Sequence, residues 1–257
     1  MSITAENLSF AYGRHRVLEQ VSFTAENGTL TALLGANGAG KTTLFRCILG
    51  LLNKYEGTLT ADGDNIRSLS PRELAHRVAY IPQSHSATFD YTVRDMVLMG
   101  TNHRLSALAS PGETENQLAG RAMEQVGIAR LEHKYYTHLS GGEQQLVLVA
   151  RALAQGSRTL LMDEPTASLD YGNQLLVMEQ AKKLAREGYC VMVSTHTPQH
   201  ALWYAHRVLA LHEGRLLAAG EPAEVMTAAC IRTLYGIEAG FIPTENGPLL
   251  CPVFSKP

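Results

Sequence analysis

Residues 35–42 read GANGAGKT, a spacing that suits the binding of a phosphate chain. Glycines let backbone N–H groups wrap around an anion, and the start of a following helix favours negative charge further. Lys41 would reach the β- and γ-phosphates of a nucleotide, and the Thr42 hydroxyl would bind Mg²⁺. The alternative is a glycine-rich turn with a surface lysine. The apolar run at 30–34 and the helical pattern at 43–49 argue against that alternative, because a strand, a glycine loop and a helix form the setting in which this spacing binds phosphate.

A second candidate group is the carboxylate pair Asp163 and Glu164, which follows an apolar run at 159–162. In proteins with a phosphate loop, the neighbouring strand presents an aspartate to Mg²⁺. A glutamate beside it can orient and deprotonate the attacking water. Taken alone, two carboxylates would indicate only a strand end that meets solvent. Together with the phosphate loop, they predict hydrolysis of a nucleotide.

Residues 139–145 read LSGGEQQ and are followed by a helical pattern that runs to Ala154. Ser140 can cap that helix and the two glycines allow close backbone approach, so the segment predicts a second anion site. A capping serine in a glycine-rich loop is the simpler alternative. Placed between the other two motifs, the segment resembles the signature sequence of ATP-binding-cassette (ABC) ATPases, and the resemblance covers roughly residues 1–225. It implies a head-to-tail homodimer in which the signature of one subunit completes the ATP site of the other.

The same resemblance gives roles to four isolated residues. Tyr12 would stack on adenine, and Gln83 would contact Mg²⁺ and couple to a membrane subunit. Asp170 lies in a loop that would cross the dimer interface, and His196 would sense the γ-phosphate. Without the resemblance, Tyr12 would be an ordinary strand aromatic and His196 a capping residue.

Three sets of site residues follow from the motifs and the resemblance. The residues expected to bind ATP are Tyr12, Asn37, Gly38, Ala39, Gly40, Lys41, Thr42, Thr43, Ser140, Gly141, Gly142 and Asp170. The residues expected to hold Mg²⁺ are Thr42, Gln83 and Asp163. The residues expected to act in catalysis are Glu164 as general base, His196, Gln83 and Lys41. Catalysis would then be chiefly positioning and charge stabilisation.

The hydrophobic pattern places these motifs on an α/β framework. Alternation of apolar and polar residues predicts N-terminal strands, and short continuous apolar runs predict buried parallel strands. Strands are expected at 3–10, 17–23, 57–60, near Ile66, and at 78–82, 159–162 and 190–194, and helices between 92 and 154, with breaks at 110–112 and Gly127, and at 173–187. The fold class expected is a P-loop NTPase (RecA-like) core with an N-terminal antiparallel β subdomain and an inserted helical signature subdomain.

These elements predict a division of the chain. The cassette would span 1–225, with the helical subdomain inserted at about 85–152, and a short C-terminal tail would span 226–257. The tract at 84–91 contains one histidine and no second ligand at metal spacing. We expect it to be a loop that faces the membrane partner and not a metal site.

Composition argues against several other classes of protein. The chain has 257 residues, of which 45% are hydrophobic and 18% charged, enough for a well-buried core. Its net charge of −2 gives no basic balance that would favour nucleic acid. No apolar run approaches the ~18 residues needed to cross a bilayer, and the beginning of the chain does not look like a secretory signal. The four cysteines lack metal-ligand spacing, so we expect a reduced, cytosolic protein.

Weaker similarities narrow the group within the family. Residues 92–100, 220–227 and 234–237 resemble segments of importers of iron chelates, haem, cobalamin and, in some members, molybdate. The alternative is that these are ordinary helices and a frayed C-terminus. The signature helix has Leu146 where an arginine is more usual. His196 is followed by Thr-Pro where many relatives have an aspartate, so the cargo stays open.

The function expected from all these features is that of the ATP-hydrolysing subunit of an ABC importer for a metal chelate or related cargo. Two copies would sandwich two ATP molecules and move two polytopic permease subunits, and a substrate-binding protein would act indirectly. The chain would lie at the cytoplasmic face of the inner (plasma) membrane as a peripheral subunit. An exporter subunit, or a soluble ABC ATPase of DNA repair or translation, is the alternative; the sequence shows neither a long coiled-coil insert nor a second cassette.

Overall fold

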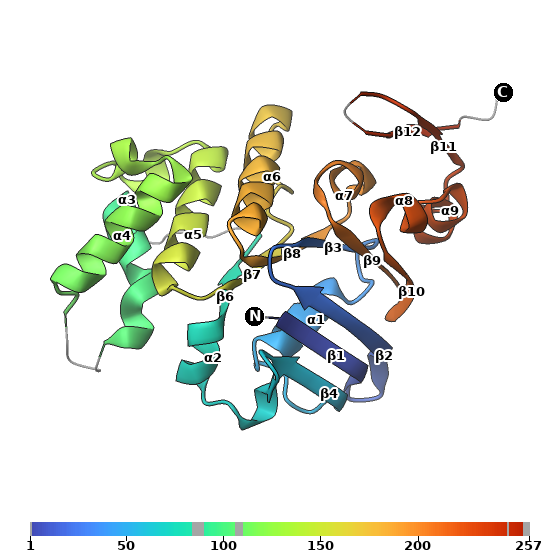
Figure 1. The fold of residues 1–257 in the computed structure, drawn as a ribbon, viewed down its shortest axis with the longest axis horizontal. Coiled ribbons are helices and arrows are strands. Elements are labelled where there is room, and N and C mark those ends of the chain that lie inside the picture. Colours follow the sequence, from blue (N-terminus) through green and yellow to red (C-terminus); the bar gives the residue numbers. More distant parts are fainter. Residues whose placement is uncertain (1, 84–89, 106–109, 246, 254–257) are drawn as a thin grey trace.

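The computed structural model describes residues 2–83, 90–105, 110–245 and 247–253, arranged around two sheets and a C-terminal hairpin (Figure 1). The strands are β1 (Ser2–Tyr12), β2 (His15–Glu26), β3 (Leu30–Leu34), β4 (Glu56–Ala61), β5 (Asp64–Asn65), β6 (Val78–Ile81), β7 (Thr159–Asp163), β8 (Cys190–Thr195), β9 (Arg207–His212), β10 (Arg215–Gly220), β11 (Ala239–Ile242) and β12 (Leu249–Pro252). One sheet is antiparallel with the order β2-β1-β4-β5, and the larger sheet has the order β10-β9-β3-β8-β7-β6. In the larger sheet only the pairing of β10 with β9 is antiparallel, among the described strands.

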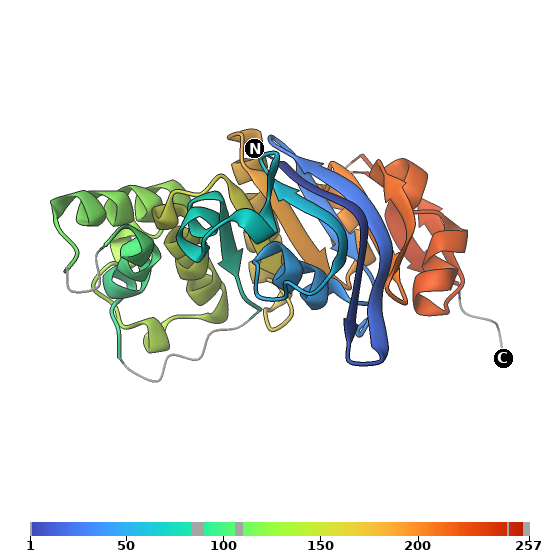
Figure 2. The same ribbon diagram turned by 90° about the horizontal axis from the view of Figure 1, so that it is seen from below.

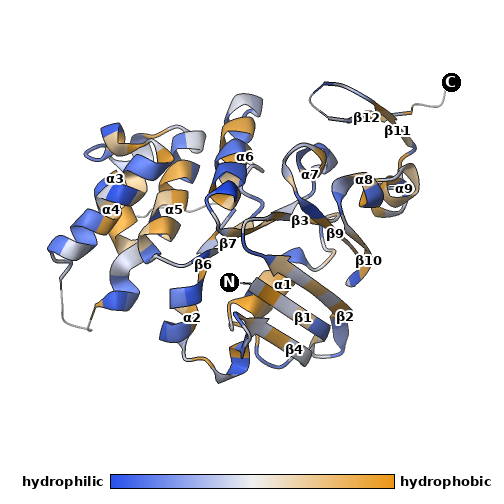
Figure 3. Ribbon diagram, viewed as in Figure 1, coloured by the Kyte–Doolittle hydropathy of each residue, from blue (hydrophilic) through white to orange (hydrophobic). Residues whose placement is uncertain are grey.

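Helices cover both faces of the larger sheet, and α3 and α4 pack on α5 beside it (Figure 1). They are α1 (Lys41–Ile48), α2 (Pro71–Arg77), α3 (Val93–Leu98), α4 (Glu113–Val126), α5 (Gly141–Gln155), α6 (Tyr171–Arg186), α7 (Pro198–Tyr204), α8 (Pro222–Val225) and α9 (Ala228–Tyr235). Short 3₁₀ helices are η1 (Ile66–Ser68), η2 (Met99–Arg104), η3 (Ala129–Leu131) and η4 (Tyr136–His138). Apolar and polar residues alternate along α4, α5 and α6 in Figure 3, as expected of helices with one face turned to a core.

The central strand β3 shows why its segment is almost entirely apolar. All five of its residues are buried. Leu33 packs with α1 and the antiparallel sheet on one side. Ala32 and Leu34 pack with α7 and α9 on the other. Because successive side chains point to opposite faces, a strand covered on both faces is apolar at nearly every position, and Thr31 is the one polar residue of β3. Figure 2 shows the antiparallel sheet and α1 on one side of this layer.

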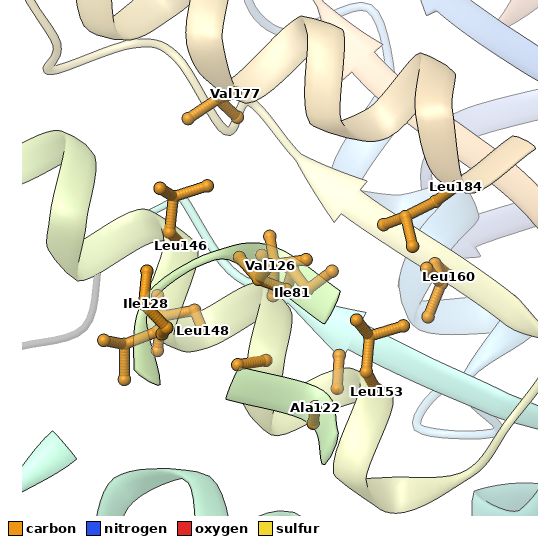
Figure 4. Packing of buried hydrophobic residues seen from close by; sticks show 14 of the residues in the cluster. Ile81, Ala122, Val126, Ile128, Leu146, Leu148, Leu153, Leu160, Val177 and Leu184 are labelled. Atoms are coloured by element: carbon orange, nitrogen blue, oxygen red, sulfur yellow. The ribbon is translucent and has the colours of Figure 1, made fainter. Parts of the chain in front are cut away.

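The helical region is inserted between β6 and β7, which pair directly as parallel neighbours. Its core is continuous with one face of the sheet. Ile81 and Leu160 of the sheet pack in the same cluster as Val126 and Leu153 of the helices (Figure 4). The helices α3, α4 and α5 are therefore anchored on the sheet by shared apolar packing and not by the two connections alone.

The C-terminal elements pack on α7. Cys230, Ile231 and Leu234 of α9 share a core cluster with Ala201 of α7. The side chain of Gln199, also in α7, holds the β11–β12 hairpin with two hydrogen bonds. Its Nε2 donates to the carbonyl oxygen of residue 248 at 3.0 Å, and its Oε1 accepts from the backbone N–H of residue 250 at 2.8 Å.

The predicted fold class is confirmed, with its antiparallel β subdomain and parallel core sheet. The predicted strand near Ile66 is wrong in detail: the strand β5 ends at Asn65, and Ile66 begins η1, because the Asn65 side chain accepts a hydrogen bond from the Arg67 backbone and so caps that turn. Most of the tract predicted to face the membrane partner, at 84–89, lies outside the described residues. No helix in the described residues is long and apolar enough to cross a bilayer.

Candidate functional site

The loop between β3 and α1 has the shape that the glycine spacing predicts. Gly40 is the N-cap of α1 at φ 107°, a left-handed conformation that only glycine adopts easily. A Cβ at Gly40 would lie 2.9 Å from the carbonyl oxygen of Val17, and one at Gly35 would lie 2.4 Å from that of Leu211. Both glycines are therefore required by the space around the loop, and Gly40 is required by its backbone conformation as well.

Lys41, the first residue of α1, points back across this loop. Its side chain is only 5% exposed. Its Nζ donates to the carbonyl oxygens of Gly35 at 2.8 Å and Ala36 at 3.1 Å, and it forms an ion pair with Glu164 Oε1 at 3.1 Å. The lysine thus joins the phosphate loop to the carboxylate at the end of β7.

Glu164 occupies the centre of this group of side chains. Its second oxygen, Oε2, lies 3.1 Å from Nδ1 of His196, whose side chain is 45% exposed. The Glu164 backbone is left-handed, with φ 44°, and is held by hydrogen bonds from its N–H to the Ser194 hydroxyl at 2.9 Å and to the Ser194 carbonyl at 3.2 Å. A left-handed glutamate costs conformational energy, which neighbouring contacts must offset. Such strain is common where a side chain has to be aimed at a reacting group.

Asp163 is fixed quite differently from its neighbour. It is buried. Ser194 Oγ donates to its Oδ1 at 2.6 Å, and the Tyr80 hydroxyl donates to its Oδ2 at 3.1 Å. Burial and the charge of Asp163 raise the pKa of Tyr80, so that the phenol keeps its proton and remains a donor. The motif analysis missed Ser194 and Tyr80. The available signal was a polar group in each of two otherwise apolar strands, at their carboxyl ends.

A cavity of about 350 Å³ brings half of the predicted residues together. Its lining residues are Val17, Asn37, Gly38, Gly40, Lys41, Thr42, Thr43, Gln83 and Glu164. Of the predicted ATP-binding residues in the loop, Ala39 does not line this cavity: it is buried, and its carbonyl accepts a hydrogen bond from the Gly214 N–H at 3.2 Å. Val17 was not predicted, and nothing in its sequence context marks it.

The three residues predicted to hold Mg²⁺ offer hard oxygen donors. Thr42 contributes a hydroxyl and Gln83 an amide, and both line the cavity. Asp163 contributes a carboxylate directly before Glu164, which lines it too. Hydroxyl, amide and carboxylate oxygens suit a divalent cation such as Mg²⁺, which binds few protein groups and keeps substrate phosphates as further ligands. No group of three or more His, Cys, Asp or Glu residues gathers into a metal cluster in the described part of the chain, so the phosphates would have to complete the site.

The signature residues form a separate site on the surface. Ser140 is the N-cap of α5, and it accepts from the Glu143 N–H at 3.3 Å while Glu143 Oε2 accepts from the Ser140 N–H at 3.1 Å. That backbone hydrogen bond lowers the pKa of Glu143. A Cβ at Gly142 would lie 2.1 Å from Asn173 Oδ1, and the Asn173 N–H donates to Asp170 at 2.9 Å. The signature loop is thus packed against the start of α6, where Asp170 is the N-cap.

None of Ser140, Gly141, Gly142 and Asp170 lines the cavity at the phosphate loop. Tyr12 also lies outside it. The Tyr12 side chain is 44% exposed and meets Phe10 edge-on, with ring centroids 4.9 Å apart. Part of Tyr12 is therefore open to solvent.

Comparison with known proteins identifies the family to which the chain is similar. A family profile described as ABC transporter matches residues 18–167. The hemin import ATP-binding protein HmuV of Bordetella avium is 40% identical over 260 residues, which cover 97% of this chain and 98% of that protein. The cobalamin import ATP-binding protein BtuD of Halobacterium salinarum is 36% identical over 256 residues, which cover 98% of this chain and 64% of that protein.

A solved structure of an ABC transporter has a fold similar to that of this chain. It is described as an inward-facing conformation of an ABC transporter of the metal-chelate type, and it matches with a TM-score of 0.87 at 28% identity, over 98% of this chain and 97% of that chain. The phosphate loop, Asp163 and Glu164 all fall within the matched family region. The chain therefore belongs to the ABC transporter family, as an ATP-hydrolysing subunit of the importer type.

Proposed function

We propose that this chain powers the import of a metal chelate, of the haem or cobalamin class, by hydrolysing ATP at the cavity beside the phosphate loop. The observation that carries the proposal is the position of Glu164, whose two carboxylate oxygens lie 3.1 Å from Lys41 Nζ and 3.1 Å from His196 Nδ1. These three groups surround the place where a γ-phosphate and its attacking water would lie. The cargo class is supported by the names of the relatives, which import hemin and cobalamin.

In the proposed reaction each residue keeps to one task. Loop N–H groups and Lys41 bind the phosphates, and Lys41 exchanges its contacts with the Gly35 and Ala36 carbonyls for phosphate oxygens. Glu164 orients the water and accepts its proton as general base. His196 contacts the γ-phosphate, and Tyr12 stacks on adenine.

Thr42, Gln83 and Asp163 would hold Mg²⁺ in this site. When bound, the cation would neutralise charge on the β- and γ-phosphates. Asp163 suits this role because two hydroxyls fix its carboxylate. Thr42 and Gln83 suit it because both line the cavity.

Two copies of the chain would form a head-to-tail dimer, in which Ser140, Gly141, Gly142 and Asp170 of each copy complete the site of the other. The separation of the signature site from the cavity within one chain supports this arrangement, because one copy does not bring the two anion sites together.

Subunits of this type work with membrane permease components. We propose two polytopic permease subunits, contacted through the helical subdomain at about 85–152 of a cassette at 1–225, with 226–257 as a C-terminal segment. The subunit would bind peripherally at the cytoplasmic face, and a substrate-binding protein would deliver the cargo.

The test is ATPase activity of the chain reconstituted with its permease partner in liposomes. Binding proteins loaded with haem, cobalamin, ferric siderophore or molybdate would be added one at a time. We expect stimulation by a haem- or cobalamin-loaded protein. Activity that stays constant with every member would contradict the proposed cargo class, and the absence of ATP hydrolysis would contradict the proposed mechanism.

A further inference from the structure

A groove of about 410 Å³ lies between the α/β core and the helical region, and one of its wall residues reaches the Asp163 carboxylate. The core side is formed by α2 and β6, and the helical side by η2 and α5, with His103 and Arg151 among the lining residues. Tyr80 of β6 also lines this groove. Tyr80 is partly buried and packs against the core cluster that contains residues of α1. Its ring therefore forms part of the groove wall, and its hydroxyl points towards the core.

The Tyr80 hydroxyl forms a hydrogen bond with the Asp163 carboxylate. It donates to Oδ2 at 3.1 Å, while Ser194 donates to Oδ1 at 2.6 Å. The two donors come from β6 and β8, the strands on either side of β7. Each oxygen of the carboxylate therefore has one hydroxyl donor, and the plane of the carboxylate is fixed from both neighbouring strands.

The strand that carries Tyr80 is in turn tied to the helix that carries the signature. Gln155, the last residue of α5, donates from Nε2 to the Val78 carbonyl at 2.9 Å and to the Ala75 carbonyl at 2.5 Å. A continuous set of contacts thus runs from α5 through the start of β6 and Tyr80 to Asp163.

We propose that Tyr80 is a positioning residue, which orients the Asp163 carboxylate for the divalent cation and connects that carboxylate to the wall of the groove. The inference rests on the proposed Mg²⁺ role of Asp163. A hydrogen-bonded neighbour of a metal ligand fixes the direction of its lone pairs, and removal of such a neighbour typically lowers metal affinity or activity about 10- to 100-fold. A bulky ring in the groove wall would also make the position of Asp163 sensitive to what fills the groove.

The test is the full chain carrying Tyr80→Phe, which keeps the ring and its packing and removes one hydroxyl. Binding of a fluorescent ATP analogue is titrated against Mg²⁺ concentration and, separately, measured in EDTA. We expect the Mg²⁺ midpoint to rise about tenfold, with affinity in EDTA unchanged. A purely structural role would not move the Mg²⁺ midpoint, so an unchanged midpoint would overturn the proposal.

Tyr55→Phe is the matched control, because the Tyr55 hydroxyl is also buried but has no hydrogen-bond partner among the described residues. Its Mg²⁺ midpoint should equal that of the unmodified chain, and an equal shift in both variants would overturn the proposal. Asp163→Asn separates the proposal from the function on which it rests. If Asp163→Asn raises the midpoint and Tyr80→Phe does not, Tyr80 is not a positioning residue. If neither raises it, the Mg²⁺ role of Asp163 itself is wrong.

Discussion

The helix α1 follows a glycine-rich loop and α5 begins with two glycines, yet their N-termini are completed in opposite ways. At α1 the N-cap is Gly40, with neither a side-chain cap nor an acidic residue in the first turn among the described residues. At α5 the N-cap is Ser140, and Glu143 closes a capping box with it. The first N-terminus presents uncapped N–H groups and a positive dipole end to an anion. The second has satisfied its own donors and placed a carboxylate beside them.

Because of this difference, one copy of the chain can use the N-terminus of α1 to bind phosphate, whereas the N-terminus of α5 can act only on a phosphate that another copy presents. Phosphate can enter the loop of α1 without displacing a cap, and Lys41 needs only to exchange the Gly35 and Ala36 carbonyls for phosphate oxygens. At α5 a phosphate would have to replace the contact between Ser140 and Glu143, and it would meet a negative charge as it approached. We infer that ATP binding belongs to the single chain, and that the signature acts only when a second copy presents a bound nucleotide.

The largest expected effect is that of Glu164→Gln. In this variant the N-terminus of α1 in one copy and the N-terminus of α5 in the other copy should hold the same ATP for long enough to be observed. Loss of the general base should lower the rate of hydrolysis about 10²- to 10⁴-fold. ATP affinity should change little, so a dimer should accumulate with ATP and be visible by size-exclusion chromatography with light scattering. The control is Glu179→Gln, because Glu179 is an exposed residue of α6. Normal hydrolysis by Glu164→Gln would show that the base is another group.

Lys41→Ala should weaken phosphate binding at the N-terminus of α1. Loss of charge-assisted hydrogen bonds of about 3 kcal/mol corresponds to about 100-fold weaker nucleotide binding. Fluorescence titration with an ATP analogue measures this directly, with Lys54→Ala, an exposed lysine, as the control. Unchanged affinity would mean that the loop binds phosphate without its lysine.

Ser140→Ala should affect only the N-terminus of α5. We expect hydrolysis in the assembled transporter to fall about tenfold, from the loss of one hydrogen bond to a charged group, with ATP affinity of the single chain unchanged. Ser70→Ala is a matched control, because Ser70 caps α2 in the same kind of capping box with Glu73. Equal losses of hydrolysis in the two variants would reduce Ser140 to an ordinary helix cap.

The smallest effect concerns the carboxylate that closes the signature cap. Because the pKa of Glu143 is lowered in the folded chain, its contribution to stability is present above the usual glutamate pKa of 4.5 and is lost as pH falls through the lowered value. Glu143→Gln should therefore lower the melting temperature by about 1 °C near neutral pH.

The difference in melting temperature between Glu143→Gln and the unmodified chain should disappear in acid. Thermal unfolding measured across pH checks this. Glu73→Gln in α2, whose pKa is also lowered by its capping serine, should show a change of the same sign. A difference that grew in acid would contradict the assigned role of Glu143.

Local pattern was sufficient to predict the elements that carry the motifs. The strand, loop and helix around Lys41 depend on residues adjacent in sequence; the strand has the predicted bounds, and the helix, predicted at 43–49, spans Lys41–Ile48. The helix predicted to run to Ala154 ends one residue later, at Gln155. Such features are set by short-range periodicity and glycine conformations, which a sequence displays directly.

The partners of Asp163 could not be predicted in the same way. Tyr80 and Ser194 are 83 and 31 residues from it, and they meet it only because of the order of β6, β7 and β8 and of their register. The β11–β12 hairpin is a similar case, since the side chain of Gln199 holds a segment about 50 residues away. The division at 225 and the individual roles of the site residues stay predictions.

The left-handed backbone of Glu164 has a consequence for engineering this protein. A glycine or asparagine at that position would adopt φ 44° with less strain, of the order of 1 kcal/mol. The same exchange would remove the carboxylate that we propose as the general base. A screen that scored variants by melting temperature alone would therefore be drawn towards inactive ones at residue 164, and any programme of thermostabilisation has to read out turnover at the same time.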